Sequence, residues 1–127
     1  MGEPLEIKSG EYARARLKTD VEMAVDSSGL IHGGFTFSLA DYAAMIAVNE
    51  PYVVLTSAKV QFTRPVRVGE EMTAEAHVVQ TEGKKRTVEV KVFSNANAVF
   101  DGELTCVVLE RHVLEGVAGN QEKGKLV

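Results

Sequence analysis

The stretch from Phe35 to Asn49 constrains this chain more than any other, because it is apolar on nearly every side of a helix. Its length and its alanine and methionine content favour a helix, and Asn49 followed by Pro51 marks where that helix ends. Counted from Gly33, the helix would be about 25 Å long. A helix without a polar face is normally buried. The rest of the chain must therefore wrap around it.

The segments on either side of this helix have the pattern of β-strands. Residues 11–25 alternate between apolar and charged side chains, as a half-buried strand does. After the helix, β-rich segments separated by short turns span residues 53–63, 72–81, 86–94 and 98–111. Residues 1–10 form a polar lead-in, and 113–127 are expected to be a flexible tail. We expect one α+β domain over residues 1–112, in which five antiparallel strands cover one helix.

The expected sheet covers only one side of the helix. The bare side would be covered by a second copy of the chain, so the pattern predicts at least a homodimer.

Composition limits the partners and the location. Fourteen Lys and Arg against eighteen Asp and Glu give a net charge of −4, which argues against nucleic acid as the main partner. The most apolar stretch, residues 42–48, is too short to span a bilayer, so we expect no membrane partner. The single cysteine, Cys106, suits a reducing compartment, and neither a signal peptide nor a zinc-spaced cluster is evident. We expect a cytoplasmic protein that needs no metal and no cofactor.

Asp41 is the strongest functional clue, because it is a carboxylate in the middle of an apolar helix. Burying an unpaired carboxylate costs free energy or raises its pKa. Ser38 lies three residues earlier on the same face, so an exposed polar strip or an ordinary ion pair would also explain Asp41.

His32, Gly33 and Gly34 precede the helix. Two glycines let a ligand approach the backbone closely, and the first N–H groups of a helix point outward without an internal partner. Such groups can hold a developing oxyanion. Asp41 follows Gly34 by seven residues, about two turns, on nearly the same face. A carbonyl held at the helix start, with a base further along, is a hydrolytic geometry. A tight turn capped by His32 is the structural alternative.

Several other residues could contact a substrate or carry chemistry. Cys106 is expected to pack as a small apolar side chain, and no nucleophile elbow, P-loop or dinucleotide fingerprint is present. Basic side chains form a possible phosphate-contacting set, although charges at a turn are more often simply solvated. This set comprises Arg64, Arg67, Lys84, Lys85 and Arg86.

The run from His32 to Ala43, His-Gly-Gly-Phe-Thr-Phe-Ser-Leu-Ala-Asp-Tyr-Ala, resembles the signature of hotdog-fold acyl-CoA thioesterases of the phenylacetate-degradation type. The resemblance extends from about Val21 to Glu110 and includes Phe62-Thr-Arg-Pro65 and Val68-Gly69. It implies a sheet wrapped around a long helix, thioester sites at a dimer interface, and a homotetramer. The implied substrate is an acyl-CoA or acyl-carrier-protein thioester.

The resemblance also implies roles for single residues. Asp41 matches the catalytic carboxylate, which acts as nucleophile or as base for a water. Gly33 or Gly34 matches the backbone donor to the thioester carbonyl, and His32 matches the histidine that shapes the oxyanion site. Thr56 falls at or next to a hydroxyl that holds the water.

Asp26 marks a departure from the family, which often has Asn six residues before the histidine. A carboxylate cannot donate a hydrogen bond to the carbonyl unless it is protonated. Ser27 or Ser28 substitutes for the amide, or the site is weaker, or the substrate sits differently.

Residues 40–49 are also similar to the effector-binding domain of a regulator of bacterial lipid synthesis, which binds acyl thioesters without cleaving them. The sequence therefore predicts a thioesterase, with a non-catalytic acyl-thioester-binding module as the alternative. A hotdog hydratase or dehydratase is a third class, but its site motif is absent. The acyl group itself is not indicated.

Overall fold

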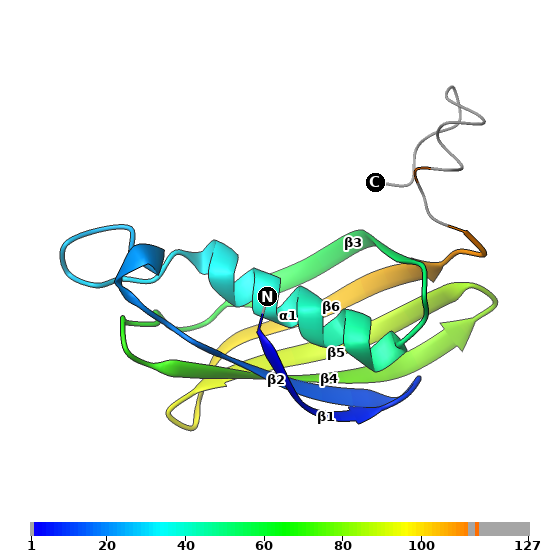
Figure 1. Ribbon diagram of the computed structural model, residues 1–127, viewed down its shortest axis with the longest axis horizontal. Helices are drawn as coiled ribbons and strands as arrows, with labels where there is room; N and C mark the ends of the chain where they lie inside the picture. The colour runs from blue at the N-terminus through cyan, green and yellow to red at the C-terminus, as the bar shows by residue number, and fades with distance from the viewer. Residues whose placement is uncertain (1, 112–113, 115–127) are drawn as a thin grey trace.

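The computed structural model describes residues 2–111 and Leu114, and Figure 1 labels its elements. One long helix, α1 (Gly33–Val48), lies across one face of a single antiparallel sheet, and a short 3-10 turn, η1 (Val21–Met23), precedes it. The strands are β1 (Glu3–Lys8), β2 (Tyr12–Lys18), β3 (Val53–Phe62), β4 (Glu71–Glu82), β5 (Lys85–Ser94) and β6 (Asn97–Val108). Their order in the sheet is β1-β2-β4-β5-β6-β3. The predicted α+β architecture, a sheet wrapped around one helix, is confirmed.

The sheet has six strands, so the prediction of five was wrong. The additional strand is β1, formed by residues expected to be a polar lead-in, and all of its residues are exposed. It is held to β2 by pairs between Arg16 and Glu3 (3.2 Å) and between Arg14 and Glu6 (3.5 Å). A strand exposed on both faces lacks the alternation of a half-buried strand, which is why the sequence pattern did not reveal it.

The strand predicted over residues 11–25 is also shorter than expected, because β2 ends at Lys18. Asp20 then caps η1, its side chain accepting a hydrogen bond from the Glu22 N–H over 3.0 Å. An aspartate whose side chain bonds the backbone two residues on favours a turn over a continued strand. The remaining strands lie within about three residues of their predicted bounds.

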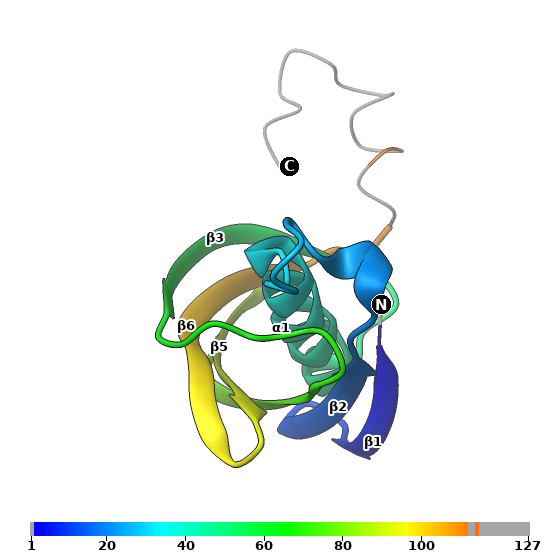
Figure 2. The same ribbon diagram turned by 90° about the vertical axis from the view of Figure 1, so that its left-hand side faces the viewer.

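The core lies between α1 and the concave inner face of the sheet, which curls around the helix from β1 to β3 in Figure 2. Small side chains on the helix let the sheet approach closely, and larger ones from both layers fill the space between them. The fully buried helix residues include Ala40, Ala43, Ala44 and Ala47, and the largest buried side chains include Phe100, Leu39, Met72 and Leu104.

One face of α1 is not covered by the sheet. Ser38, Asp41, Tyr42 and Met45 are only half-buried and follow one another at helical spacing. We call these residues the open stripe. In the single chain the helix is therefore not buried on all sides.

The second edge of the sheet, β3, is also open. Residues 56–59 are exposed, and a β-bulge between Leu55 and Ser57 leaves Thr56 as an extra residue. Edge strands carry unpaired backbone groups that can pair with another chain.

The outer face of the sheet carries a row of alternating charges. The strands β1, β2, β4, β5 and β6, in their order in the sheet, each contribute one charged residue that pairs with the charged residue of the next strand. The sign of the charge changes from each strand to the next. The row consists of Glu6, Arg14, Glu75, Lys91 and Asp101, and it ends at Gln61 on β3. Opposite charges facing each other across strands stabilise a sheet by about 0.2–1 kcal/mol per pair.

Two expectations concern the limits of the chain. The tail expected over residues 113–127 lies, apart from Leu114, outside the described residues. Among the residues that are described, no helix is long and apolar enough to cross a bilayer.

Candidate active site

A small hairpin fixes the position at which α1 begins. Ala24 bridges to Ile31, and the His32 N–H donates to the Met23 carbonyl over 3.0 Å. The Ile31 N–H donates to the Val66 carbonyl over 2.8 Å, which ties the hairpin to the connection between β3 and β4. The start of the helix is therefore held from two sides.

Asp26 and Ser27 lie at the exposed tip of this hairpin. The Asp26 Oδ1 accepts hydrogen bonds from the N–H groups of Ser28 (3.0 Å) and Leu30 (3.3 Å). An aspartate that bonds the backbone two residues on closes an Asx turn. An asparagine Oδ1 would make the same bonds. This geometry favours a turn-closing function for Asp26.

His32 caps the helix, and its side chain engages the backbone N–H of only one of the two glycines. Its Nδ1 accepts a hydrogen bond from the Gly34 N–H over 2.8 Å. A Cβ on Gly34 would lie only 2.8 Å from that nitrogen, so the cap requires glycine there. The Gly33 N–H has no partner among the described residues. The sequence pattern did not decide between the two glycines as donors, and in the described part of the chain the N–H of Gly34 is engaged whereas that of Gly33 is free.

Phe62, at the end of β3, lies directly beside Gly33. A Cβ on Gly33 would be 3.3 Å from the Phe62 Cε2. The ring also packs edge-on against Phe100, with the ring centroids 5.2 Å apart. Phe62 was not predicted as a site residue. Its contact joins the end of β3 to the start of α1, and the whole helix lies between these two positions in the sequence. No pattern of neighbouring residues in the sequence indicates this contact.

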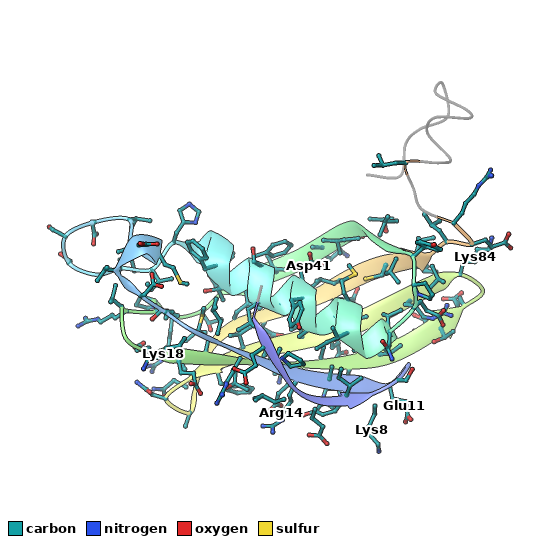
Figure 3. All side chains as sticks on the ribbon, viewed as in Figure 1. Lys8, Glu11, Arg14, Lys18, Asp41 and Lys84 are labelled. Carbon is teal, nitrogen blue, oxygen red and sulfur yellow. The ribbon has the colours of Figure 1, made fainter. Side chains whose placement is uncertain are left out.

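Asp41 lies near the middle of α1, on the open stripe (Figure 3). Its Oδ1 is buried and has no hydrogen-bond partner among the described residues. Burial raises the pKa of this carboxyl group above its ordinary value. None of the ion pairs within residues 2–111 involves Asp41, so the ordinary ion pair considered from the sequence is not observed. A buried acceptor without a donor is costly, and an incoming hydroxyl or water would satisfy it.

Cys106 on β6 is fully buried and unpaired, as expected for a small apolar side chain. Burial raises the pKa of its thiol to about 11, and the negative charge of Asp41 contributes to that rise. A thiol must ionise to act as a nucleophile. Cys106 is therefore not expected to act as a nucleophile at neutral pH.

Thr56 is exposed on β3, and its hydroxyl donates to the Thr105 carbonyl over 3.1 Å. The hydroxyl oxygen can still accept a hydrogen bond from a water.

The five basic residues proposed to contact phosphates do not form one group. Arg64 and Arg67 precede β4, whereas Lys84, Lys85 and Arg86 lie at and after its other end. The twelve residues of β4 separate the two groups by roughly 40 Å. Figure 3 shows Lys84 at the end of the molecule where α1 ends. Within one chain the five residues therefore do not form a single group, and their contact with phosphates stays a prediction.

Two members of the second group are engaged within the protein. Lys84 pairs with Glu110 over 3.6 Å, and the Arg86 guanidinium donates to the Gly83 carbonyl over 2.6 Å. In the described part of the chain, no group of three or more His, Cys, Asp or Glu side chains is arranged to hold a metal ion.

Comparison with known proteins assigns the family. Residues 28–100, more than half of the chain, match the thioesterase superfamily. The chain belongs to this superfamily, and its fold is the hotdog fold.

Two solved structures are similar to this one over most of its length. PH1136, an uncharacterized protein from Pyrococcus horikoshii, is 55% identical with a TM-score of 0.87, and the match covers 90% of this chain and 87% of that one. A point mutant of the phenylacetic acid degradation protein PaaI from Thermus thermophilus is 28% identical with a TM-score of 0.76, and the match covers 84% of this chain and 92% of that one.

The curated relatives are longer than this chain. A methylthioribose-1-phosphate isomerase from Aquifex aeolicus is 48% identical over 85% of this chain, but the match covers only 24% of that protein. A transcription factor FapR from Caldanaerobacter subterraneus is 25% identical over 98% of this chain and 62% of its own length. The chain therefore spans a quarter of one relative and under two thirds of the other.

Proposed function

We propose that this protein hydrolyses an acyl thioester of coenzyme A or of an acyl carrier protein to the free acid and the thiol. The observation that carries the proposal is Asp41, whose buried Oδ1 has no partner in the described chain and which lies two turns from the unpaired Gly33 N–H. Membership of the thioesterase superfamily supports this reaction class. The name of the Aquifex isomerase describes a protein four times as long as the match and suggests no activity for this chain.

Gly33 and Asp41 divide the chemistry between them. Within one chain eight residues of helix separate them by about 12 Å, so the pair that acts on one carbonyl comes from the two copies that meet at the proposed subunit boundary. The Gly33 N–H donates to the thioester carbonyl oxygen and stabilises the negative charge that develops on it. Asp41 takes a proton from a water that attacks the carbonyl carbon, or it attacks that carbon itself. In the first route the C–S bond breaks and the thiolate leaves and is protonated. In the second route an acyl–aspartate anhydride forms first, and water then opens it.

The proposal includes a homodimer with the site at the subunit boundary, and by resemblance a homotetramer. The open stripe on α1 and the exposed edge of β3 are the two surfaces that a second copy would cover. Light scattering at micromolar concentration is expected to give at least twice the chain mass of 13.8 kDa. A monomer would contradict the dimer.

The second candidate function is binding of an acyl thioester without cleavage. The resemblance of residues 40–49 to an acyl-thioester-binding domain of a regulator favours it, and a transcription factor, FapR, matches along 98% of this chain. Both functions place a thioester at the same site, so they differ only in turnover.

Asp41→Asn separates the two functions, because it keeps size and polarity and removes the base. If the protein is a hydrolase, thiol release from a panel of acyl-CoA thioesters should fall by roughly 10²–10⁴-fold while acyl-CoA still binds. Ser38→Ala, on the same open stripe, is the matched control and should keep parental turnover.

The other outcomes are equally distinct. A binding module shows no turnover in either protein and tight acyl-CoA binding in both. If Asp41 is only structural, the variant melts at a lower temperature and its folded fraction keeps parental turnover.

A further inference from the structure

A cleft of about 290 Å³ opens at the N-terminal end of α1, between the helix start and the connection from β3 to β4. Gly33, whose N–H is unpaired, forms part of its wall, and Arg64 contributes the charged side chain of the lining. Apolar side chains supply most of the remaining surface. They are Ile31, Phe62, Pro65 and Val66.

The hydroxyl groups of this cleft are already engaged within the protein. The Thr36 hydroxyl donates to the Met72 sulfur over 3.3 Å, and the Thr63 hydroxyl donates to the Ala98 carbonyl over 3.0 Å. The Thr63 N–H donates to the Val99 carbonyl over 2.9 Å. A ligand group in the cleft therefore meets mainly hydrocarbon, and the free donors that it meets are the Gly33 N–H and the Arg64 guanidinium, which has no hydrogen bond or ion pair in the described part of the chain.

This chemistry distinguishes the two arms of a thioester. The pantetheine arm of the carrier contains two amide groups, which lose hydrogen bonds to water if they are buried without partners. An acyl chain has no such requirement and gains from burial in an apolar cleft. With the carbonyl oxygen at the Gly33 N–H, the acyl arm is the one that the cleft suits.

We propose that this cleft binds the acyl group of the substrate and that the Phe62 ring is the wall that limits its length. The inference rests on the proposed function for the identity of the ligand. The ring contacts Gly33 and packs against Phe100, so it forms one side of the cleft. The Phe62 residue remains 54% exposed. At about 30 Å³ for each water-sized group, the cleft holds roughly ten non-hydrogen atoms. The expected substrates carry a medium-length aliphatic acyl group or an aryl-acyl group of similar size.

Binding of S-alkyl-CoA thioethers tests this without any need for turnover, because a thioether cannot be hydrolysed. We would measure dissociation constants by calorimetry for alkyl chains of two to sixteen carbons. Each added methylene should tighten binding about threefold to fourfold, the ratio for burying one CH₂ group. The gain should stop at roughly eight to ten carbons, where the cleft is full.

Two substitutions of Phe62 should move that limit in opposite directions. Phe62→Ala opens the wall and should extend the gain by several carbons, and Phe62→Trp should end it earlier. Because the ring is half exposed, both variants are expected to fold, which circular dichroism checks. Val79→Ala is the control, since Val79 is also half exposed, at 49%, but lies outside the cleft on β4. It should leave the limit unchanged.

The failures of the two proposals are distinguishable. Thioether affinity that does not depend on chain length, or a limit unmoved in both Phe62 variants, overturns the acyl cleft even if the protein hydrolyses thioesters. Chain-length-dependent binding without any turnover supports the cleft and contradicts hydrolysis.

Discussion

The two ends of α1 differ in how completely the protein satisfies their backbone groups. At the C-terminal end, Asn49 adopts the left-handed conformation and its N–H donates to the Met45 carbonyl over 2.9 Å. The Ala47 carbonyl accepts a hydrogen bond from the Gly10 N–H over 2.8 Å. At the N-terminal end, His32 satisfies Gly34, and the Gly33 N–H has no partner in the described part of the chain. One end is closed by the protein itself, and the other is left open beside an apolar cleft.

The open N-terminal end is where a ligand can act on the helix. A helix start carries outward N–H groups and the positive end of the helix dipole, both of which favour a developing negative charge. Chemistry is therefore expected at the Gly33 end, although both ends of the helix lie over the same sheet.

After Asp41→Asn, Gly33→Pro should have the largest effect, because it removes the unpaired N–H and keeps the start of the helix. Proline is favoured at the first helical position, and His32 already has the extended conformation that a residue before proline adopts (φ −61°, ψ 130°). Thioester turnover should fall by roughly 10²–10³-fold, the scale for losing one oxyanion donor. Steady-state assays of thiol release measure this.

Gly33→Ala is the matched control for this variant. It also places a Cβ beside Phe62, but it keeps the N–H, so most activity should remain. If both variants lose activity equally, crowding at Phe62 is responsible and the N–H has no catalytic role.

The raised pKa of Asp41 should shift the acid limb of the pH–rate profile upward. The ionised carboxylate is the active form, so kcat/KM should increase about tenfold per pH unit below the folded-state pKa and then level off. Because burial raises that pKa, the midpoint should lie above the ordinary carboxyl value of about 3.9. A profile that is already flat at the ordinary value would exclude Asp41 as the titrating base.

The raised pKa of Asp41 should affect stability and activity in opposite directions: activity increases with pH in this range, whereas stability decreases. The folded state holds the Asp41 proton more tightly than the unfolded state does. The free energy of unfolding should therefore decrease as pH rises from the unfolded to the folded pKa. Comparing pH-dependent melting of the parent protein and Asp41→Asn isolates this contribution.

The two groups of basic residues lie near opposite ends of α1, Arg64 in the cleft beside Gly33 and Lys84 where the helix ends. If the acyl arm enters the cleft beside Gly33, Arg64 lies in the wall of the acyl site, and we expect the other group to contact the carrier phosphates. Neutralising Lys84, Lys85 and Arg86 to Gln should then raise the KM for acyl-CoA by roughly threefold to tenfold with little change in kcat, as uniform binding contacts do. The double variant Arg64→Gln, Arg67→Gln should change KM less. A larger KM change in the Arg64, Arg67 variant than in the Lys84, Lys85, Arg86 variant would place the carrier phosphates at the N-terminal end of α1.

Replacing His32 should have the smallest effect. His32→Ala removes the cap on Gly34 and should cost about 1 kcal/mol of stability, whereas His32→Asn should keep most of it. Chemical denaturation measures the difference. Should turnover fall far more than stability in both variants, His32 acts on the substrate and not only on the helix.

Local features explain which parts of the molecule were predictable from sequence. The helix and its C-terminal cap follow from residues close together in the chain and were predicted, and the cap by His32 was the structural alternative for the N-terminal end. The contact between Phe62 and Gly33, the separation of the two basic groups and the strand β1 depend on how distant segments pack. Alternation signals a strand only when one face is buried, so β1 left no pattern to recognise.

The outer row of alternating charges has a consequence for how the sheet assembles. Inside–outside alternation excludes a one-residue slip between strands, because such a slip would turn apolar side chains outward. It does not exclude a two-residue slip, which restores the alternation. A two-residue slip of β5 against β4 can bring Glu89 opposite Glu75, in place of the native partner Lys91. An attractive pair is then exchanged for a repulsive one. Between β4 and β5 the charges of the row therefore favour the native register over the slipped one during folding.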